Sequence, residues 1–184
     1  MAVNVTPLSL PEVLLITPAC YEDHRGFFME TWHQEVYRQA GLPERFVQDN
    51  RSHSKKGVLR GLHYQLRHPQ GKLVYPVTGA IFDVAVDIRP DSATFGRWTG
   101  AELSRENRRQ IYIPEGFAHG FVVLSESADV IYKCTDFYAP GDEYGLLWCD
   151  PDIGIDWPAA SPVLSDKDRQ APALKQIPRA HLPG

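Results

Sequence analysis

An arginine, a histidine and a lysine lie among apolar residues and glycines in one short stretch, VLRGLHYQLRHPQGKLV, which spans residues 58–74. They are Arg60, His63 and Lys72. The surrounding pattern is typical of β-sheet, and a sheet interior is a costly place for such groups unless they have partners. Histidine can act as a general base near neutral pH, and arginine and lysine can bind an anion. The stretch therefore indicates either an acid–base site for an anionic substrate or a metal site.

Arg60 and His63 can share one pocket only if their strand is irregular. Side chains alternate between the two faces of a regular strand, so positions 60 and 63 fall on opposite faces. Gly61 lies between them and permits a bulge or the close approach of a ligand. A lone histidine in a strand is more often a structural residue, so a common pocket requires a departure from regular pairing near Gly61.

A metal site is the first alternative. The run IPEGFAHGF, residues 113–121, has the P-x-G-x-x-H spacing of the second sequence box of the cupin superfamily, a jelly-roll barrel. Metal-binding cupins supply H-x-H from the first box, whereas here the next histidine after His63 is His68. Strand alternation puts these two on opposite faces, which leaves His119 as the only well-placed ligand. We therefore expect no metal.

A carboxylate and a phenol could instead complete an acid–base site. Asp166 and Asp168 flank Lys167 in LSDKD, and the sequence leaves two interpretations open: an ordinary helix N-terminus, or an Asp168 that orients His63. Tyr132 is one of three tyrosines in VIYKCTDFYAPGDEYG. Most strand tyrosines are packing residues, but a phenol with a reference pKa of ~10 stays protonated and could act as the opposing acid.

Two further polar stretches could contact a ligand. DHRGFFMETW carries Arg25 and Glu30 among aromatic residues, and a charged edge strand is its simpler interpretation. QDNRS, residues 48–52, is rich in groups that suit either turns or polar ligands.

Composition limits the class of protein. A chain of 184 residues with 43% hydrophobic content and no linker-like stretch predicts one domain, residues 1–184. A formal charge of −4 without a basic cluster argues against nucleic-acid binding. Three cysteines without metal-like spacing fit a reducing compartment. The N-terminus has neither a basic region nor a long apolar run, so we expect no membrane span and a cytoplasmic location.

Short strand-like runs separated by Pro and Gly predict an all-β sandwich or barrel with few helices. The run IFDVAVDI, residues 81–88, alternates as a half-buried strand does. Helical turns are expected at residues 34–40, 104–107 and 165–169, and the proline-containing tail, about residues 170–184, is expected to wrap the surface. The expected strands are residues 13–16, 26–31, 46–50, 58–65, 72–78, 80–88, 96–103, 109–113, 120–124, 130–135 and 145–148.

Nine motifs in order carry a family resemblance over about residues 8–171: DHRGFFMETW, FVQDN, VLRGLHYQ, QGKLV, FDVAVDIR, FGRW, IPEGFAHGF, YKCTDFYAPGDE and LSDKD. Together they closely resemble the dTDP-4-dehydrorhamnose 3,5-epimerase family. The resemblance implies a cupin jelly roll without catalytic metal or cofactor and a homodimer. It implies inversion of C3 and C5 of dTDP-4-dehydro-6-deoxy-D-glucose, a dTDP-4-keto-6-deoxy sugar, in dTDP-L-rhamnose synthesis.

The resemblance also implies roles for individual residues. His63 corresponds to the base that removes a proton from carbon, Asp168 to its dyad partner, and Tyr132 to the acid on the opposite face. Lys72 corresponds to the group that stabilises the C4 oxyanion. The implied substrate contacts are Arg60, His119, Gln48, Asn50 and Lys167 toward the diphosphate and sugar, Tyr138 near the base, Glu143 as a polar contact, and Arg25 and Glu30 on an N-terminal strand swapped into the partner's site.

The chemistry accounts for these residue types. C3 and C5 both flank the C4 ketone, so enolate formation acidifies their protons, and inversion needs a base on one face and an acid on the other. Preorganised positive charge must then meet the oxyanion. Tyr75 and Pro76 stand where relatives often have Arg and another apolar residue, but this departure removes no proposed catalytic group.

Three alternatives remain open. Mono-epimerases that act at C3 or C5 only have the same motifs, so the product is less certain than the reaction class. A metal-dependent cupin oxygenase or isomerase would contain stoichiometric iron, manganese or zinc. A non-enzymatic sugar-binding cupin would bind a dTDP-sugar without exchanging its C3 or C5 hydrogens with solvent.

Overall fold

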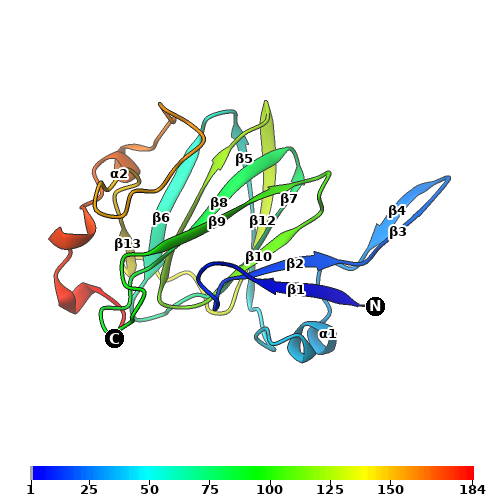
Figure 1. Ribbon diagram of the computed structural model, residues 1–184, viewed down its shortest axis with the longest axis horizontal. Coiled ribbons are helices and arrows are strands. Elements are labelled where there is room, and N and C mark those ends of the chain that lie inside the picture. The colour runs from blue at the N-terminus through cyan, green and yellow to red at the C-terminus, as the bar shows by residue number, and fades with distance from the viewer. Residues whose placement is uncertain (1) are drawn as a thin grey trace.

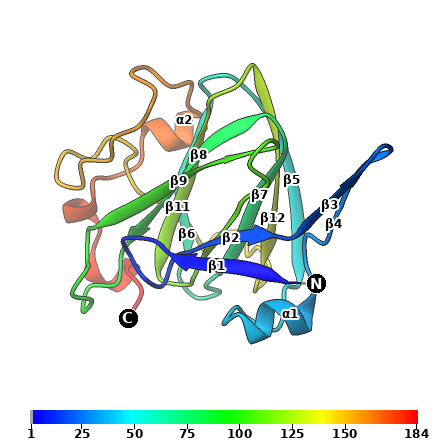
Figure 2. The same ribbon diagram turned by 45° about the vertical axis from the view of Figure 1, so that its right-hand side comes forward.

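Two antiparallel sheets pack face to face and enclose the interior of the protein (Figures 1 and 2). The computed structural model describes residues 2–184. The six-stranded sheet has the order β1 (Val3–Pro7), β2 (Leu14–Pro18), β10 (Gln110–Ile113), β7 (Lys72–Thr78), β12 (Ser127–Cys134) and β5 (Gln48–Lys55). The five-stranded sheet has the order β13 (Glu143–Gly145), β6 (Leu59–Gln65), β11 (Phe117–Val123), β8 (Ala80–Asp87) and β9 (Trp98–Ser104). The expected all-β jelly-roll class is confirmed.

The remaining elements lie outside these sheets. A hairpin of β3 (Cys20–Asp23) and β4 (Gly26–Met29) projects away from the body of the molecule (Figure 1). The helical segments are short, and those expected at residues 34–40 and 165–169 are confirmed. They are α1 (Gln34–Gln39), α2 (Asp166–Arg169) and the 3₁₀ turns η1 (Leu174–Gln176) and η2 (Arg179–His181). Among the described residues, no helix has the length and apolar character needed to cross a membrane.

Several strand boundaries differ from those expected. β1 and β3 were not expected, and β5 extends beyond residue 50 to Lys55. β5 reads QDNRSHSK and lacks the apolar alternation that marks a strand. Its alternate residues from Gln48 to Ser54 are the less exposed ones, and three of them line a polar cavity rather than a hydrophobic core. Because the inward-facing residues of such a strand are polar, apolar and polar residues do not alternate, and the strand cannot be recognised from its hydrophobic pattern.

The expectation that residues 81–88 form a half-buried strand is wrong, because both faces of β8 are buried. Ala85 belongs to the core between the two sheets. Val84 and Val86 point the other way and are fully buried in a second core on the outer side of the five-stranded sheet. The alternation is therefore between two buried environments, which the period alone cannot distinguish from core and solvent.

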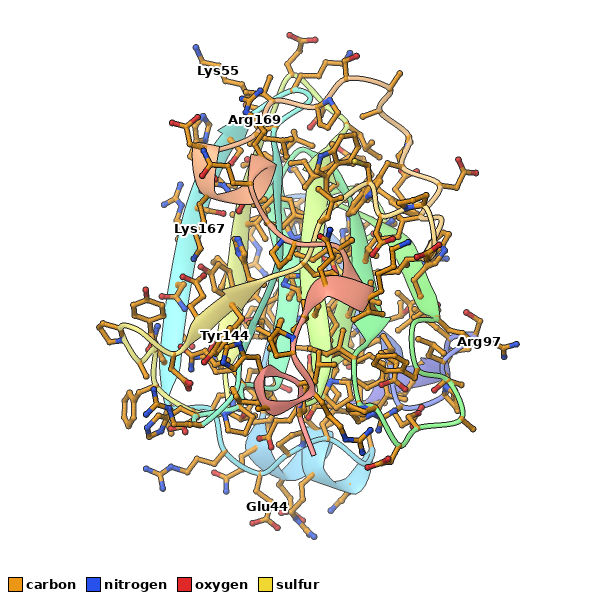
Figure 3. The ribbon with its side chains drawn as sticks, turned by 90° about the vertical axis from the view of Figure 1, so that its left-hand side faces the viewer. Glu44, Lys55, Arg97, Tyr144, Lys167 and Arg169 are labelled. Carbon is orange, nitrogen blue, oxygen red and sulfur yellow. The ribbon has the colours of Figure 1, made fainter. Side chains whose placement is uncertain are left out.

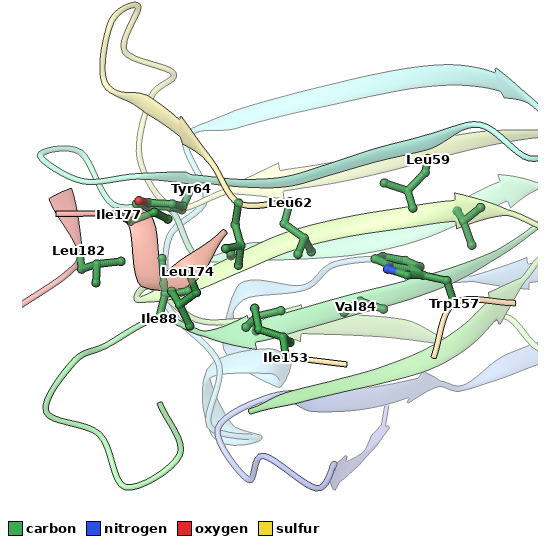
Figure 4. Packing of buried hydrophobic residues seen from close by; sticks show 14 residues of the cluster. Leu59, Leu62, Tyr64, Val84, Ile88, Ile153, Trp157, Leu174, Ile177 and Leu182 are labelled. Atoms are coloured by element: carbon green, nitrogen blue, oxygen red, sulfur yellow. The ribbon is translucent and has the colours of Figure 1, made fainter. Parts of the chain in front are cut away.

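The C-terminal part of the chain supplies the cover for this outer face. Trp157, Leu174 and Ile177 pack against β8 and β6, as Figure 4 shows. The buried Asp150 carboxylate fastens the segment by accepting the backbone N–H of Leu174 at 2.6 Å. Residues on both sides of α2 in the sequence thus support the outer face of the sheet that carries His63.

β6 contains a bulge at Gly61, as a common pocket for Arg60 and His63 requires. His119 of β11 pairs with His63 while Phe121 pairs with Arg60, so three steps along β6 match two along β11. The extra residue brings Arg60 and His63 to the same face, and both line one cavity. Gly61 has φ +120°, and a Cβ there would lie 2.5 Å from Gly120 Cα. Only glycine fits this position.

We expect Gly61→Ala to destabilise the fold far more than Gly57→Ala. Both glycines have positive φ, but a Cβ at Gly57 would meet nothing within 4 Å. Backbone strain alone should cost Gly57→Ala about 1 kcal/mol, whereas the backbone clash at Gly61 should bring the cost to roughly 3 kcal/mol. Urea unfolding of the two variants measures the difference. Equal destabilisation would show that β6 and β11 tolerate separation at the bulge.

Candidate active site

A cavity of about 670 Å³ opens between the two sheets, and its wall is formed by both of them together with α2 and the loop before β13. It gathers all the expected site residues except Arg25 and Glu30. Figure 3 shows Lys167 on α2 above β13, which carries Tyr144. The site residues that line the cavity are Gln48, Asn50, Arg60, His63, Lys72, His119, Tyr132, Tyr138, Glu143, Lys167 and Asp168.

His63 and Asp168 form a short pair at one wall. His63 Nε2 lies 2.6 Å from Asp168 Oδ1, and the Asp168 side chain is 5% exposed. Burial alone would raise the pKa of Asp168, but hydrogen bonds from His63, Ser165 and the Gly61 backbone outweigh it and hold that pKa below its usual value. Asp168 therefore remains a carboxylate that can orient the imidazole and stabilise its charged form.

The local sequence explains how Asp168 reaches this position. Ser165 is the N-cap of α2, and its hydroxyl accepts the backbone N–H of Asp168. The two interpretations of LSDKD are therefore both realised: the motif begins a helix, and the helix directs Asp168 toward His63. Asp166, the other acidic residue of the motif, does not line the cavity.

Tyr132 approaches the cavity from the opposite sheet. It lies on β12, where it pairs with Asn50 of β5, while His63 lies on β6 of the facing sheet. Burial raises the pKa of the Tyr132 phenol, so it is a proton donor at neutral pH. An imidazole and a phenol thus line one cavity from facing sheets.

Two further cationic candidates, Lys72 and His119, are buried and depend on Asp83. His119 Nε2 lies 2.9 Å and 3.0 Å from the two Asp83 oxygens. Burial lowers the pKa of Lys72, and the nearby Cys134, Glu143 and Asp83 oppose that shift. Burial raises the pKa of the fully buried Asp83, and His119 and Lys72 oppose it. The three groups form one coupled cluster at the cavity wall.

Sequence reasoning missed Asp83 as a site residue. It lies on β8 within IFDVAVDI, where its alternation with valines predicts the polar face of a half-buried strand. A carboxylate in a strand between apolar residues does carry a signal, because such a group is buried only when it has partners. Its partners are 36 residues away in sequence, at His119, and across the sandwich, at Lys72.

Glu143, Lys167 and Tyr138 lie together at the mouth of the cavity. The Lys167 ammonium pairs with Glu143 Oε2, and the Tyr138 hydroxyl lies 3.5 Å from the same oxygen. The other Glu143 oxygen lies 3.7 Å from His63 Nδ1. The Tyr138 ring is half exposed and free to contact a ligand.

Two glutamines hold the loop that carries Tyr138. Gln48 Oε1 accepts the backbone N–H of Tyr138 at 2.8 Å, and Gln65 Oε1 accepts that of Ala139 at 2.9 Å. Gln65 also donates to the carbonyl oxygens of His68 and Phe137. Gln48, expected to contact substrate, thus has a structural partner as well, and Gln65 is a second support that sequence reasoning missed.

Arg25 and Glu30 lie away from this cavity. Arg25 is at the turn of the β3–β4 hairpin, pairs with Asp23 and has a side chain that is 79% exposed. Glu30 directly follows β4. The structure of one chain therefore does not bring these two residues to the other site residues. Within residues 2–184, no group of three or more His, Cys, Asp or Glu side chains is arranged to hold a metal ion.

Comparison with known proteins shows which family the chain resembles. The family described as dTDP-4-dehydrorhamnose 3,5-epimerase matches residues 7–176. A protein of that name from Pseudomonas aeruginosa is 55% identical over 93% of this chain and 96% of its own length. The relative of the same name from Escherichia coli is 47% identical over 97% and 98%.

Solved structures agree. An epimerase from Legionella pneumophila, in complex with dTDP-4-keto-L-rhamnose, is 51% identical and covers 98% of this chain and 97% of its own, with a TM-score of 0.96. A 3'-monoepimerase from Streptomyces bikiniensis, in complex with dTDP-quinovose, is 39% identical with a TM-score of 0.90 and covers 96% and 91%. The chain therefore belongs to the dTDP-4-dehydrorhamnose 3,5-epimerase family of isomerases.

Proposed function

We propose that this cavity inverts C3 and C5 of dTDP-4-dehydro-6-deoxy-D-glucose and yields dTDP-4-dehydro-L-rhamnose, as a single cytoplasmic domain without metal or cofactor. One observation carries the proposal. A base paired with a carboxylate, His63, and a protonated phenol, Tyr132, line one cavity from opposite sheets. Inversion at carbon needs this arrangement, since the proton leaves from one face of the ring and returns to the other.

The reaction at each carbon has two steps. His63 takes the proton from the carbon beside the C4 ketone, and the electron pair of that C–H bond forms the enolate, with its charge on the C4 oxygen. The Tyr132 hydroxyl then gives its proton to the opposite face of the same carbon, and the ketone reforms. Asp168 stabilises the imidazolium between these steps.

Lys72 and His119 stabilise the negative charge that develops on the C4 oxygen. Both are buried, so the groups that they offer to the C4 oxygen act in a low-dielectric site and are already in place before the reaction. Asp83 supports both by holding His119 directly and by favouring the charged form of Lys72. Loss of one such donor typically costs ~3 kcal/mol of transition-state stabilisation.

The open side of the cavity takes the nucleotide. Arg60 and Lys167 supply positive charge for the diphosphate, and the exposed ring of Tyr138 supplies a surface on which the base stacks. Gln48, Asn50 and Glu143 provide polar contacts at the same end. The Legionella pneumophila relative, at 51% identity, carries dTDP-4-keto-L-rhamnose, which supports a dTDP-sugar as the ligand of this site.

Inversion at one carbon is the second candidate. The Streptomyces bikiniensis relative is a 3'-monoepimerase at 39% identity, so the fold serves that reaction too. The higher identities of 55% and 47% belong to 3,5-epimerases, which favours double inversion here.

A homodimer is part of the proposal and gives Arg25 and Glu30 a role. The β3–β4 hairpin projects from the body and exposes Tyr21, Phe27 and Phe28, each more than half exposed. Exposed aromatic clusters of this kind are typical of interfaces. A hairpin carried to the second copy would place its charged residues beside that copy's cavity.

Incubation of the enzyme with dTDP-4-dehydro-6-deoxy-D-glucose in heavy water should introduce deuterium at both C3 and C5, because both carbons pass through an enolate. NMR follows each position separately. Exchange at one carbon only would identify a mono-epimerase. Binding without exchange at either carbon would identify a non-enzymatic sugar-binding protein.

Substitutions of the base and the acid should fail in different ways. His63→Ala should abolish exchange at both carbons, since no group remains to remove the proton. Tyr132→Phe should retain exchange, because His63 still removes and returns a proton on its own face, but should lose inversion. NMR of deuterium content and product configuration separates these results. Full activity of His63→Ala would mean that the base is another residue.

The fall of kcat at high pH should follow the deprotonation of Lys72. Burial lowers its pKa from 10.5, so the cation and the activity should be lost below that pH as pH rises, while the Tyr132 phenol stays protonated. Asp83→Asn removes a charge that favours the cation and should move this fall down by roughly one pH unit, or ~1.4 kcal/mol. Asp91→Asn, at an exposed surface ion pair, is the control. A fall at the wild-type pH in Asp83→Asn would contradict the coupling.

Hybrid dimers test the swapped hairpin. Arg25→Ala and His63→Ala should each have low activity alone, yet a hybrid dimer would contain one site with both defects and one site with neither. Refolding the two variants together in equal amounts should therefore restore about a quarter of wild-type activity. No recovery in the mixture, with dimers verified by light scattering, would show that Arg25 serves its own chain.

A further inference from the structure

The two ring nitrogens of His63 have different surroundings. Nε2 is engaged by Asp168 at 2.6 Å, which leaves Nδ1 as the nitrogen that can accept a proton from carbon. The carboxylate oxygen Oε1 of Glu143 lies 3.7 Å from Nδ1. In the proposed reaction, the Glu143 carboxylate can have a role in proton transfer in addition to its role in substrate binding.

Double inversion makes a demand that single inversion does not. After one inversion the base has gained a proton from carbon, and Tyr132 has given one to carbon. The second carbon of the same sugar can react only when Nδ1 has lost its proton and the phenolate has regained one. Both events must be completed before the half-converted sugar dissociates.

Asp168 is poorly suited to take this proton away. Its oxygens accept hydrogen bonds from His63 and the Gly61 backbone, its side chain is 5% exposed, and its pKa is held low. A proton placed there would have no direct route to water. Asp168 therefore stabilises the imidazolium and does not discharge it.

Glu143 has the access that Asp168 lacks. Its side chain is 25% exposed at the cavity mouth, with Oε1 toward Nδ1 and Oε2 held by Lys167 and the Tyr138 hydroxyl. These two contacts fix the direction of the free oxygen. One water molecule or a small side-chain movement bridges 3.7 Å.

We propose that Glu143 carries the proton from His63 Nδ1 to solvent between the two inversions, an inference that rests on the proposed function. The proton on Nδ1 passes to Glu143 Oε1, and the electron pair of the N–H bond stays on nitrogen. The carboxylic acid then releases the proton to water and becomes a carboxylate again, while the Tyr132 phenolate takes a proton from water. The net proton change is zero.

The substitution Glu143→Gln tests this step. Glutamine keeps the size and polarity of the side chain but cannot carry the proton. In dilute buffer, the second inversion should slow at least about tenfold more than the first, so that sugar inverted at one carbon accumulates. NMR of products after short incubations gives the ratio of singly to doubly inverted sugar.

Chemical rescue distinguishes a proton carrier from a structural residue. Raising the concentration of imidazole buffer at constant pH and ionic strength should restore the second inversion in Glu143→Gln, because a small base replaces the missing carboxylate. Wild type should show no dependence on buffer concentration. Thermal unfolding at the wild-type temperature verifies that the variant is folded.

Two further variants serve as matched controls. Lys167→Met removes the ion partner but keeps the carboxylate, so it should weaken substrate binding without creating a dependence on buffer. Glu126→Gln removes a carboxylate that is 95% exposed and paired with Lys56, and should behave as wild type.

A Glu143→Gln enzyme with the wild-type product ratio and no buffer dependence would overturn the inference. Equal, buffer-independent loss of both inversions would also overturn it and would assign Glu143 to substrate binding alone. Failure of the proposed function gives a different result, since wild type itself would then exchange neither C3 nor C5 with heavy water.

Discussion

The bulge at Gly61 is the constraint on which the rest of the site depends. Without the extra residue in β6, Arg60 and His63 would point to opposite faces, one into the cavity and one into the outer core. The bulge also brings the Gly61 backbone N–H to Asp168, although at 3.5 Å this contact is long. One irregularity in the backbone thus directs Arg60, His63 and Asp168, which we propose as the anion contact, the base and its partner, toward one cavity.

The sandwich supplies what a single sheet cannot. His63 and Tyr132 come from facing sheets, so a ring bound between them has one group on each side. The same enclosure makes the charge of Lys72 costly, and Asp83 offsets that cost from the interior of β8. The buried polar residues between the sheets are therefore coupled to one another, and the apolar core fills the remaining space. Burial increases both the catalytic effect of each charge and its need for a partner.

The sequence was sufficient for the fold class and for the condition that Arg60 and His63 share a pocket only if the strand is irregular near Gly61, because turn residues and the parity of positions 60 and 63 are local signals. It failed where distant segments decide the environment. β8 appeared half-buried because its cover, including Trp157, lies some 70 residues further along the chain. Asp83 appeared to be a surface carboxylate for the same reason, and Gln65 was missed because its loop partners are separated from it in sequence.

The proposed base His63, its partner Asp168 and the proposed acid Tyr132 do not by themselves distinguish single from double inversion, because in the proposed mechanism each carbon uses the same base and acid. Their positions lie deep in the cavity and follow from the sheets. In the proposed mechanism, one and two inversions differ in how long the sugar stays bound and how fast His63 and Tyr132 recover their starting protonation states, and both depend on groups at the cavity mouth. Glu143, Lys167 and Tyr138 come from β13, α2 and a loop. These three side chains lie at the cavity mouth and can change while His63, Asp168 and Tyr132 keep their positions, so the number of inversions can vary within one fold.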